Sequence, residues 1–326
     1  MQKIQKQTVL LVGLGRSGTT WVGKIFDSHP NTLYVHEPDN WFKSLVIPLI
    51  TPNTDNTNEL KLPEYLLSLF SVSTPKVVGK LPYFDKKYQN FILNFTIKLN
   101  TYFSKFIARA SIKAPINRYI SDKKRSKCTL VWKSIESLGR VNCLINTDAN
   151  LKIIHIVRHP CGYISSILRG ERKKVFDGNF ETSNDYGVFE MLEKTSQAIQ
   201  YGLNLESFKK MLPLERLAWR WILINEKAIN DANQYQDYIL LKYEDLCSNP
   251  VEKTKELYKF SDLDWNSQTE HFLSKSTSTN SEQYYSVYKD PNHAAMKWKK
   301  ELSSNNIETI MNIVNKSNLK NLYTEK

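Results

Sequence analysis

Residues 13–18 of the chain (GLGRSG) combine two spaced glycines with an arginine, a pattern suited to binding an anion. Gly13 and Gly18 let a ligand approach the backbone closely, and Arg16 adds a fixed cation between them. A short apolar run, residues 8–12, precedes the loop, and a helical pattern follows it from Thr19. Because free N–H groups and the helix dipole favour negative charge at such a helix start, the stretch predicts an anion-binding loop.

The spacing of this loop is close to that of the nucleotide-binding Walker A motif, with one departure. Thr19 stands where that motif requires a lysine for the β- and γ-phosphates, and Arg16 supplies the nearest cation instead. ATP or GTP hydrolysis is therefore disfavoured. A glycine turn that binds nothing is the alternative, disfavoured because strand, loop and helix follow in the required order.

A second stretch, residues 156–166 (IVRHPCGYISS), places an arginine and a serine eight positions apart. Arg158 ends a predicted strand, Pro160 begins a helix, and Ser166 lies two turns along it. Ligands of open α/β sheets collect at the carboxyl ends of strands, so Arg158 and Arg16 are expected to face one nucleotide. A guanidinium fork with a hydroxyl suits a phosphate monoester, whereas an ion-paired structural arginine is the alternative for Arg158 alone.

Together these stretches resemble the sulfotransferases that use 3′-phosphoadenosine 5′-phosphosulfate (PAPS). The sequence RSGTTW, residues 16–21, is similar to their 5′-phosphosulfate loop, and the arginine–serine pair is similar to their 3′-phosphate motif. The resemblance implies PAPS as the sulfuryl donor and no metal. It implies these donor-binding residues: Arg16, Ser17, Gly18, Thr19, Thr20, Trp21, Arg158 and Ser166.

The resemblance also implies catalytic groups. Sulfuryl transfer to a hydroxyl requires a general base, and Glu37 follows His29-Pro30 at a distance similar to that in tyrosylprotein and carbohydrate sulfotransferases. His36 is the rival base, and a helix-capping role is the alternative for Glu37. Lys133 precedes Arg158 by a separation similar to that in tyrosylprotein sulfotransferases, which implies a cation at the bridging oxygen, with a surface lysine as the alternative. Arg16 completes this predicted catalytic set.

Two segments near the C-terminus complete the predicted donor site. Tyr243, in LLKYEDL, is expected either against the adenine or in the core. The sequence AMKWKKEL, residues 295–302, resembles the segment that closes over the nucleotide, with Lys297 and Trp298 as ligands. Residues 274–302 are accordingly expected to form a lid.

The elements that must position these residues are short apolar strands alternating with helices. The predicted strands are residues 8–12, 32–36, 129–132, 152–157 and 238–242. This alternation predicts an α/β fold with a central parallel sheet between two helical layers, which the resemblance identifies as the P-loop type. We expect one domain over residues 1–326, with insertions at about 39–126 and 171–212.

Four predictions concern the segments that match the family least, and these are where an acceptor pocket is expected. Residues 39–50 are predicted to be helical, residues 171–186 a mobile loop, and residues 189–212 a single helix. Residues 91–112 are predicted to form an aromatic-rich helix bearing Lys98, Lys105 and Arg109. Packing of this helix onto the domain is favoured over contact with a membrane or a partner.

Composition limits the function classes. The chain of 326 residues has 41% hydrophobic and 24% charged residues, which are globular values, and a net charge of +12. No apolar run of eighteen residues occurs, no secretory leader is evident, and the four cysteines lack paired or metal-like spacing. A cytoplasmic protein with no transmembrane segment is therefore expected, although peripheral membrane contact stays open.

The expected reaction is sulfuryl transfer from PAPS to a hydroxyl or amine of a carbohydrate, lipid or small metabolite. One alternative is a P-loop kinase of a nucleotide or small molecule, which the missing Walker lysine disfavours. A second is a non-catalytic, basic protein that binds nucleic acid or a membrane surface, although no nucleic-acid signature occurs in the sequence. Neither the acceptor nor the oligomeric state is predicted.

Overall fold

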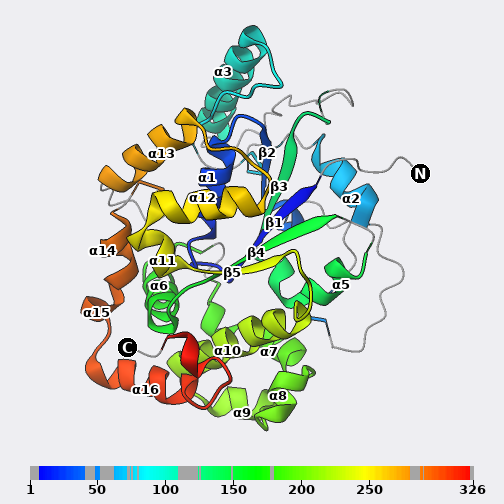
Figure 1. Cartoon of the computed structure of the whole chain (residues 1–326). Helices are drawn as coiled ribbons and strands as arrows, with labels where there is room; N and C mark the ends of the chain where they lie inside the picture. Colours follow the sequence, from blue (N-terminus) through cyan, green and yellow to red (C-terminus); the bar gives the residue numbers. More distant parts are fainter. Residues whose placement is uncertain are drawn as a thin grey trace.

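The computed structural model describes residues 7–40, 48–51, 62–71, 74, 76–78, 81–108, 124, 126–147, 150–176, 180–279, 287–288 and 290–323. At its centre is a five-stranded sheet (Figure 1). The strands are β1 (Thr8–Val12), β2 (Thr32–His36), β3 (Thr129–Ser134), β4 (Leu151–Val157) and β5 (Tyr238–Lys242). All neighbours are parallel, in the order β2-β3-β1-β4-β5. The predicted parallel α/β fold is confirmed, except that β3 extends past Trp132 and includes Lys133.

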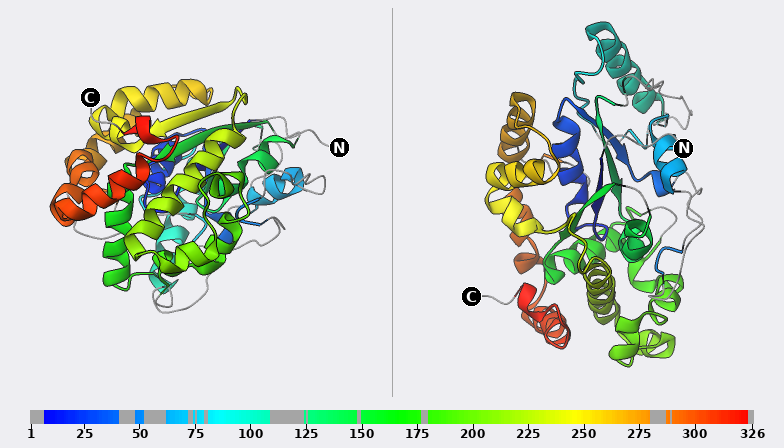
Figure 2. Two further views of the ribbon diagram at one scale, coloured as in Figure 1. Left: turned by 90° about the horizontal axis from the view of Figure 1, so that it is seen from below. Right: turned by 45° about the vertical axis from the view of Figure 1, so that its right-hand side comes forward.

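The central strand β1 is buried on both faces, as its continuous apolar run predicts. Leu10 and Val12 join one hydrophobic core, whereas Val9 and Leu11 join the other. One face is covered by α1 (Thr19–Ser28), α11 (Tyr243–Ser248), α12 (Pro250–Phe260) and α13 (Ser267–Ser278). The other is covered by α2 (Leu62–Leu69), α5 (Val141–Ile145), α6 (Pro160–Arg172), α10 (Pro213–Asp231) and α16 (Ser304–Val314). The result is the three-layer arrangement seen in Figure 2.

The shorter elements lie at the ends of these layers. They are η1 (Pro38–Asn40), η2 (Ser137–Arg140), η4 (Thr182–Asn184), α7 (Tyr186–Leu192), α8 (Ser196–Gln200), α9 (Leu205–Lys210), α14 (Pro291–Met296), α15 (Trp298–Glu301) and η5 (Lys320–Leu322). Of the segment predicted as a helix over 39–50, residues 39 and 40 belong to η1, residues 48–50 are not helical, and residues 41–47 lie outside the described residues.

The prediction of one helix over residues 189–212 is wrong, because local capping divides the segment into α7, α8 and α9. The hydroxyl of Thr195 accepts a hydrogen bond from the N–H of Ala198 and begins α8. Asn204 forms a capping box with Ser207 and begins α9, while Gly202 turns the chain between them with φ 65°. In the predicted loop over 171–186, α6 continues to Arg172 and η4 follows.

The segment predicted to form a lid is partly helical. Helix α13 reaches Ser278, so its last turn occupies the start of the segment expected to form the lid. Residues 280–286 and 289 lie outside the described residues. Helices α14 and α15 follow and bring Trp298 onto α6.

Helix α3 (Phe91–Ala108) projects from one end of the molecule in Figure 1, and its large apolar side chains are exposed to solvent. The prediction that this aromatic face packs onto the domain is therefore wrong. Within the residues that the structure describes, no helix is both long and apolar enough to span a membrane.

Candidate active site

The glycine loop between β1 and α1 is shaped by close contacts that a side chain would prevent. A Cβ atom at Gly13 would lie 2.4 Å from the carbonyl oxygen of Ile156 on β4. At Gly18, where φ is 89°, a Cβ atom would lie 2.2 Å from the Tyr243 ring. Both positions therefore require glycine, the first for its small size and the second also for its left-handed backbone.

Arg16 connects the loop to α6 and β4. Its Nε donates a hydrogen bond of 3.1 Å to the Oγ of Ser166, and its carbonyl oxygen accepts one of 3.0 Å from Nη1 of Arg158. The backbone of Arg16 is left-handed, with φ 76°, a strained conformation for a residue with a side chain. The structure thus brings together three of the residues that the two sequence motifs singled out.

Arg158 is held by several groups yet keeps one buried donor without an acceptor. Its Nη2 donates to the carbonyl oxygen of Ala294 at 2.6 Å, and its guanidinium carbon lies 5.1 Å from the centre of the Tyr243 ring. Among the described residues, no acceptor lies within hydrogen-bond distance of Arg158 Nε or of Trp298 Nε1. Both side chains border Gly162, where a Cβ atom would lie 2.9 Å from Arg158 Nε and 3.3 Å from Trp298 Cδ1. Two buried donors without an acceptor, both packed against the same glycine, mark this region as a candidate for binding an anionic acceptor.

The C-terminal helices cover this region. The Trp298 ring stacks on His159 at 4.5 Å and 10°, and burial of His159 lowers its pKa to about 4. Lys297 is more exposed and lies 3.6 Å from the carboxylate of Glu301, which also accepts hydrogen bonds from Ser165 and Arg169. Sequence reasoning missed His159 and Glu301, because their contacts are with residues distant in sequence. His159 stacks on Trp298, and Glu301 accepts hydrogen bonds from α6.

Glu37 and Lys133 form an ion pair at the carboxyl ends of β2 and β3. Glu37 has a left-handed backbone with φ 44°, and its N–H donates to the carbonyl oxygen of Lys133 at 2.8 Å. Burial lowers the pKa of Lys133, an effect that the Glu37 carboxylate opposes. Lys133 is therefore a buried strand residue with a carboxylate partner, not a surface lysine.

The rival base His36 lies beside this pair. Its Nδ1 is 2.7 Å from the hydroxyl of Tyr34, and its Nε2 is 3.9 Å from the Glu37 carboxylate. His36 and Lys133 are directly opposite each other in the β2–β3 register. All three groups line the same cavity, so which of Glu37 and His36 is the base stays a prediction.

A buried carboxylate, Asp39, fixes the turn that carries Glu37. It accepts hydrogen bonds from Tyr65, Trp132, Ser134, Ser137 and Arg140. Burial, together with the charge of Asp39, raises the pKa of Tyr65. Sequence reasoning missed Asp39, and the only available signal was its place directly after the strand end.

The remaining sequence-predicted residues take different positions. Thr19 and Thr20 line the cavity, and Ser17 is buried in the loop. The Trp21 indole donates to Ser276 at 3.2 Å on α13 and is buried. The Tyr243 ring is buried against Gly18, so a packing role is plain, and contact with an adenine stays a prediction.

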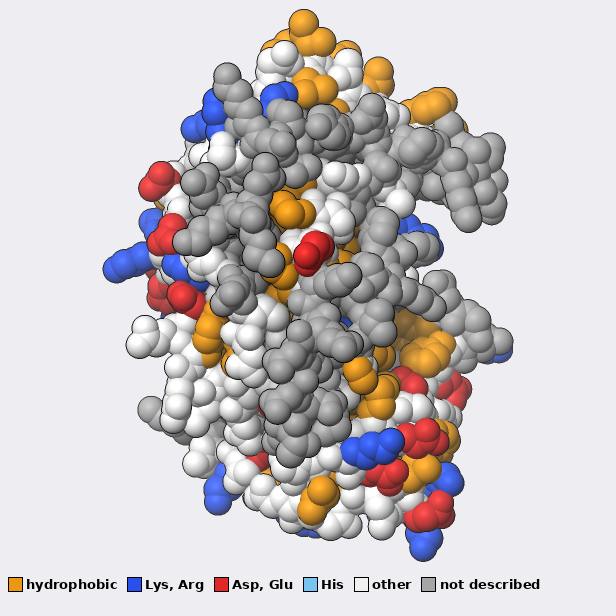
Figure 3. Space-filling view, turned by 90° about the vertical axis from the view of Figure 1, so that its right-hand side faces the viewer, with side chains coloured by type: hydrophobic (Ala, Val, Ile, Leu, Met, Phe, Trp, Pro, Cys, Tyr) orange, Lys and Arg blue, Asp and Glu red, His pale blue; other side chains and the backbone are white. Residues whose placement is uncertain are grey.

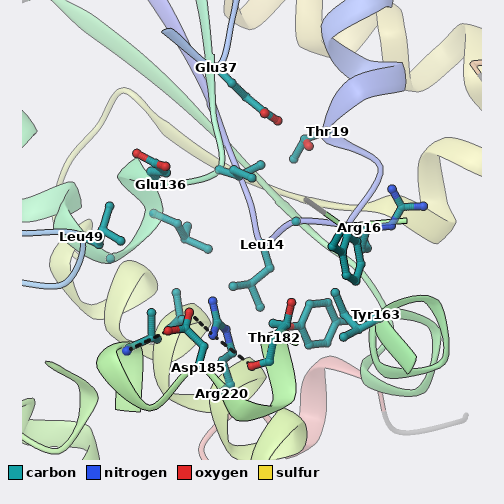
Figure 4. Close-up of a pocket in the computed structure, with 18 of the residues that line it drawn as sticks. Leu14, Arg16, Thr19, Glu37, Leu49, Glu136, Tyr163, Thr182, Asp185 and Arg220 are labelled. Carbon is teal, nitrogen blue, oxygen red and sulfur yellow. Dashed lines mark hydrogen bonds and ion pairs between the residues drawn. The ribbon is translucent and has the colours of Figure 1, made fainter. Parts of the chain in front are cut away.

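A cavity of about 610 Å³ opens beside the loop (Figure 4). Glu37 points toward Thr19 on one side of it, and Asp185, Arg220 and Thr182 lie together across it. Arg220 pairs with Asp185 at 3.3 Å. The walls are largely apolar and aromatic: Leu14, Leu49, Ile50, Ile135, Leu138, Tyr163, Ile167, Phe176, Phe180, Val188 and Ile224. Several of these residues come from the two predicted insertions, so both insertions contribute to the cavity next to Glu37.

Comparisons with known proteins point to one family. A model of the sulfotransferase family matches residues 8–267. Carbohydrate sulfotransferase 1 of Mus musculus is 21% identical over 344 residues, covering 92% of this chain and 75% of that protein. Carbohydrate sulfotransferase 3 of Mus musculus is 20% identical, covering 90% of this chain and 63% of that protein.

The chain is also similar to solved sulfotransferase structures. The sulfotransferase domain from the curacin biosynthetic pathway is 16% identical, with a TM-score of 0.47, covering 95% of this chain and 97% of that one. Mouse sulfotransferase SULT7A1, complexed with PAP, is 12% identical, with a TM-score of 0.41, covering 97% and 85%.

Proposed function

Because this chain belongs to the sulfotransferase family, we propose that it transfers a sulfuryl group from PAPS to a hydroxyl group of a carbohydrate. The observation that supports the donor most is the pair of buried, unsatisfied donors at Arg158 Nε and Trp298 Nε1. Both side chains pack against Gly162, and Arg158 is bonded to the phosphosulfate-type loop through the carbonyl of Arg16. A 3′-phosphate next to this loop would satisfy both donors.

The residues around the loop have distinct roles in this proposal. PAPS, when bound, supplies a sulfuryl group on a good leaving group. The loop amides and Arg16 hold the 5′ end of the donor at the start of α1, and Arg158 with Ser166 holds its 3′-phosphate. The hydrogen bond between Arg16 and Ser166 keeps these two anion sites adjacent, which fixes the donor's orientation.

The Glu37–Lys133 pair performs the transfer chemistry. Glu37 takes the proton of the acceptor hydroxyl while the acceptor oxygen forms a bond to sulfur and the bond from sulfur to the phosphate oxygen breaks. Lys133 leaves the carboxylate and stabilises the negative charge that develops on that phosphate oxygen. Lys133 and Glu37 are already paired at the cavity. A small displacement of Lys133 therefore frees the carboxylate to accept the proton and the ammonium to stabilise the phosphate oxygen.

The carbohydrate acceptor is supported by the curated relatives and by the cavity. The volume of the cavity is within the range of small-molecule sites, about 300–1,000 Å³. The cavity combines apolar and aromatic walls with a few polar groups that can orient hydroxyls. Glu136, Asp185 and Arg220 are the polar groups opposite the loop. The metal-free reaction and the cytoplasmic location stay predictions.

The donor is tested by calorimetric titration of the full chain with adenosine 3′,5′-bisphosphate and with ADP, both without added Mg²⁺. Tight binding of the bisphosphate alone is expected. Preference for ADP, or binding only with Mg²⁺, would favour a kinase and overturn the proposal. A screen of mono- and oligosaccharides with labelled PAPS then tests the acceptor, and sulfation of none of them would contradict the carbohydrate assignment.

A further inference from the structure

The amphipathic pattern of α3 is inverted with respect to the usual arrangement, in which the apolar face is buried. The buried row consists of Asn94, Ile97, Thr101 and Ser104, three of which are polar. Apart from Thr96, the exposed side chains described on this helix are apolar and follow helical spacing: Phe91, Ile92, Phe95, Leu99, Tyr102, Phe103 and Phe106, at 42–85% exposure. A continuous apolar row of this kind on a solvent-exposed surface marks a site that interacts with a partner, a ligand or a membrane.

This helix is rigidly held at its base. The side chain of Asn94 exchanges two hydrogen bonds of 3.0 Å with the backbone of Lys86. The ammonium of Lys86 lies 3.2 Å from the Asp27 carboxylate and donates to the Asp27 carbonyl, both at the C-terminal end of α1. The exposed face therefore projects from an anchored element, and it forms the orange side chains at the top of Figure 3.

The positive charge of the chain is concentrated in the sequence segment that contains this helix. Residues 86–127 contain eleven Lys and Arg residues and one acidic residue, Asp122. This stretch alone has a net charge of +10, compared with +12 for the whole chain. The sequence thus places nearly all of the net positive charge in and next to the segment that carries the exposed apolar row.

A cavity at the base of α3 combines both properties. It has a volume of about 510 Å³, and its lining includes Phe91 and Phe95, the cations Lys87 and Lys98, and one acid, Asp85. Lys98 is on α3 itself, so the cationic and apolar groups meet on one helix.

We propose that α3 docks this protein on an anionic membrane surface, with its apolar row among the acyl chains and the lysines and arginines of the same sequence segment supplying charge for the headgroups. An anionic bilayer offers both the apolar layer and the negative charge that this segment requires. A second copy of the chain would match the apolar row but would bring two stretches of +10 together. A nucleic acid would match the charge but has no layer for six or more exposed hydrocarbon side chains.

Docking through α3 leaves the donor loop uncovered. The segment that leads into α3 contacts the C-terminal end of α1. Lys86 pairs with Asp27 of α1, and the N–H of Lys87 donates to the carbonyl of Pro30, two residues after α1. The glycine loop is at the opposite, N-terminal end of α1. Membrane binding and donor binding are therefore separable, and variants of α3 should keep their affinity for adenosine 3′,5′-bisphosphate.

Flotation of the full chain with lipid vesicles tests the proposal. The vesicles contain phosphatidylcholine alone, or with about a third of the lipid as phosphatidylglycerol. The test variant carries Phe95→Gln and Leu99→Gln, which remove two apolar groups of 59% and 61% exposure without changing charge. The matched control carries Ile199→Gln and Leu212→Gln, at 68% and 67% exposure on other elements.

The wild type and the control are expected to float with the anionic vesicles, and the α3 variant to partition at least about tenfold less. Equal binding to neutral vesicles, no binding to anionic vesicles, or equal loss in the control would each overturn the proposal. Sedimentation velocity without lipid tests the rival occupant. If the wild type dimerises and the α3 variant does not, the face is an interface between two copies, and the membrane assignment fails.

Discussion

Arg16 and Ser166 are 150 positions apart in the chain, and Nε of Arg16 donates a hydrogen bond of 3.1 Å to the Ser166 Oγ. One residue belongs to the glycine loop after β1 and the other to α6 after β4. Because β1 and β4 are adjacent and parallel, their carboxyl ends meet at one edge of the sheet. The two anion-binding motifs of the sequence are therefore parts of one site.

Replacing Ser166 by alanine should weaken the binding of adenosine 3′,5′-bisphosphate about tenfold, because a charge-assisted hydrogen bond is lost. The affinity for AMP, which lacks the 3′-phosphate, should change little. Calorimetric titration with both nucleotides measures the ratio. Ser165→Ala is the matched control, since the Ser165 hydroxyl donates to Glu301 instead. An equal loss for both nucleotides would contradict the assignment of Ser166 to the 3′-phosphate.

Glu37→Gln should abolish turnover, by about 10²–10⁴-fold, while binding of the bisphosphate stays nearly intact. The amide keeps the size of the side chain but cannot accept the acceptor's proton. Turnover is measured with labelled PAPS and a saccharide identified by the screen. His36→Gln serves as the comparison at the adjacent position, where a small effect is expected. Full activity of the Glu37 variant together with loss in the His36 variant would transfer the role of base to His36.

Gly162→Ala tests the pair of unsatisfied donors. The new methyl group would lie 2.9 Å from Arg158 Nε and must displace the guanidinium. We expect bisphosphate affinity to fall about tenfold through the loss of charge-assisted hydrogen bonds to the 3′-phosphate. Thermal unfolding should change little, because alanine is favoured over glycine within a helix by up to about 1 kcal/mol.

The matched control for this variant is Gly187→Ala on α7. A Cβ atom there would meet only the Asp185 carboxylate, at 3.8 Å. The control should therefore keep the affinity for the bisphosphate. Unchanged bisphosphate affinity in Gly162→Ala would mean that Arg158 and Trp298 do not bind the 3′-phosphate.

The strands and the loop could be predicted because their signals are local. A continuous apolar run such as residues 8–12 indicates a strand buried on both faces, and the strand order then brings Arg16, Arg158 and Lys133 to one edge. The helix boundaries over 189–212 could not be predicted with the same security. There, hydrophobic periodicity continues across the caps at Thr195 and Asn204 that interrupt the helix.

The groups that sequence reasoning missed depend on contacts between distant segments. In the sequence, Asp39 is only an acid close to a strand end. Its role becomes visible when the fold places Trp132, Ser137 and Arg140 around it. The aromatic stripe of α3 is visible in the sequence, but periodicity does not tell whether the stripe faces a core or the solvent. The polar residues Asn94, Thr101 and Ser104 on the opposite face gave no warning, because the usual amphipathic pattern would expose them and bury the aromatic stripe.

The stability of the protein should decrease as the pH falls from about 7 to 5, and His155 should account for part of the decrease. Burial lowers the pKa of His155 from 6.5 to about 4, so the folded chain keeps this imidazole neutral between Tyr238 and Asn225. The unfolded chain binds the proton below pH 6.5, which favours unfolding as the pH falls toward 4. One such histidine lowers the free energy of unfolding by about 2 kcal/mol at pH 5.

Urea unfolding at pH 7 and pH 5 measures this contribution. His155→Gln should be less stable at pH 7, because its packing is altered, but should lose less stability between the two pH values than the wild type. The exposed His271→Gln is the matched control and should keep the full difference. Burial also lowers the pKa values of His29 and His159 to about 4, so the His155 variant should retain part of the decrease. An unchanged difference in His155→Gln would mean that His155 does not contribute to the pH dependence.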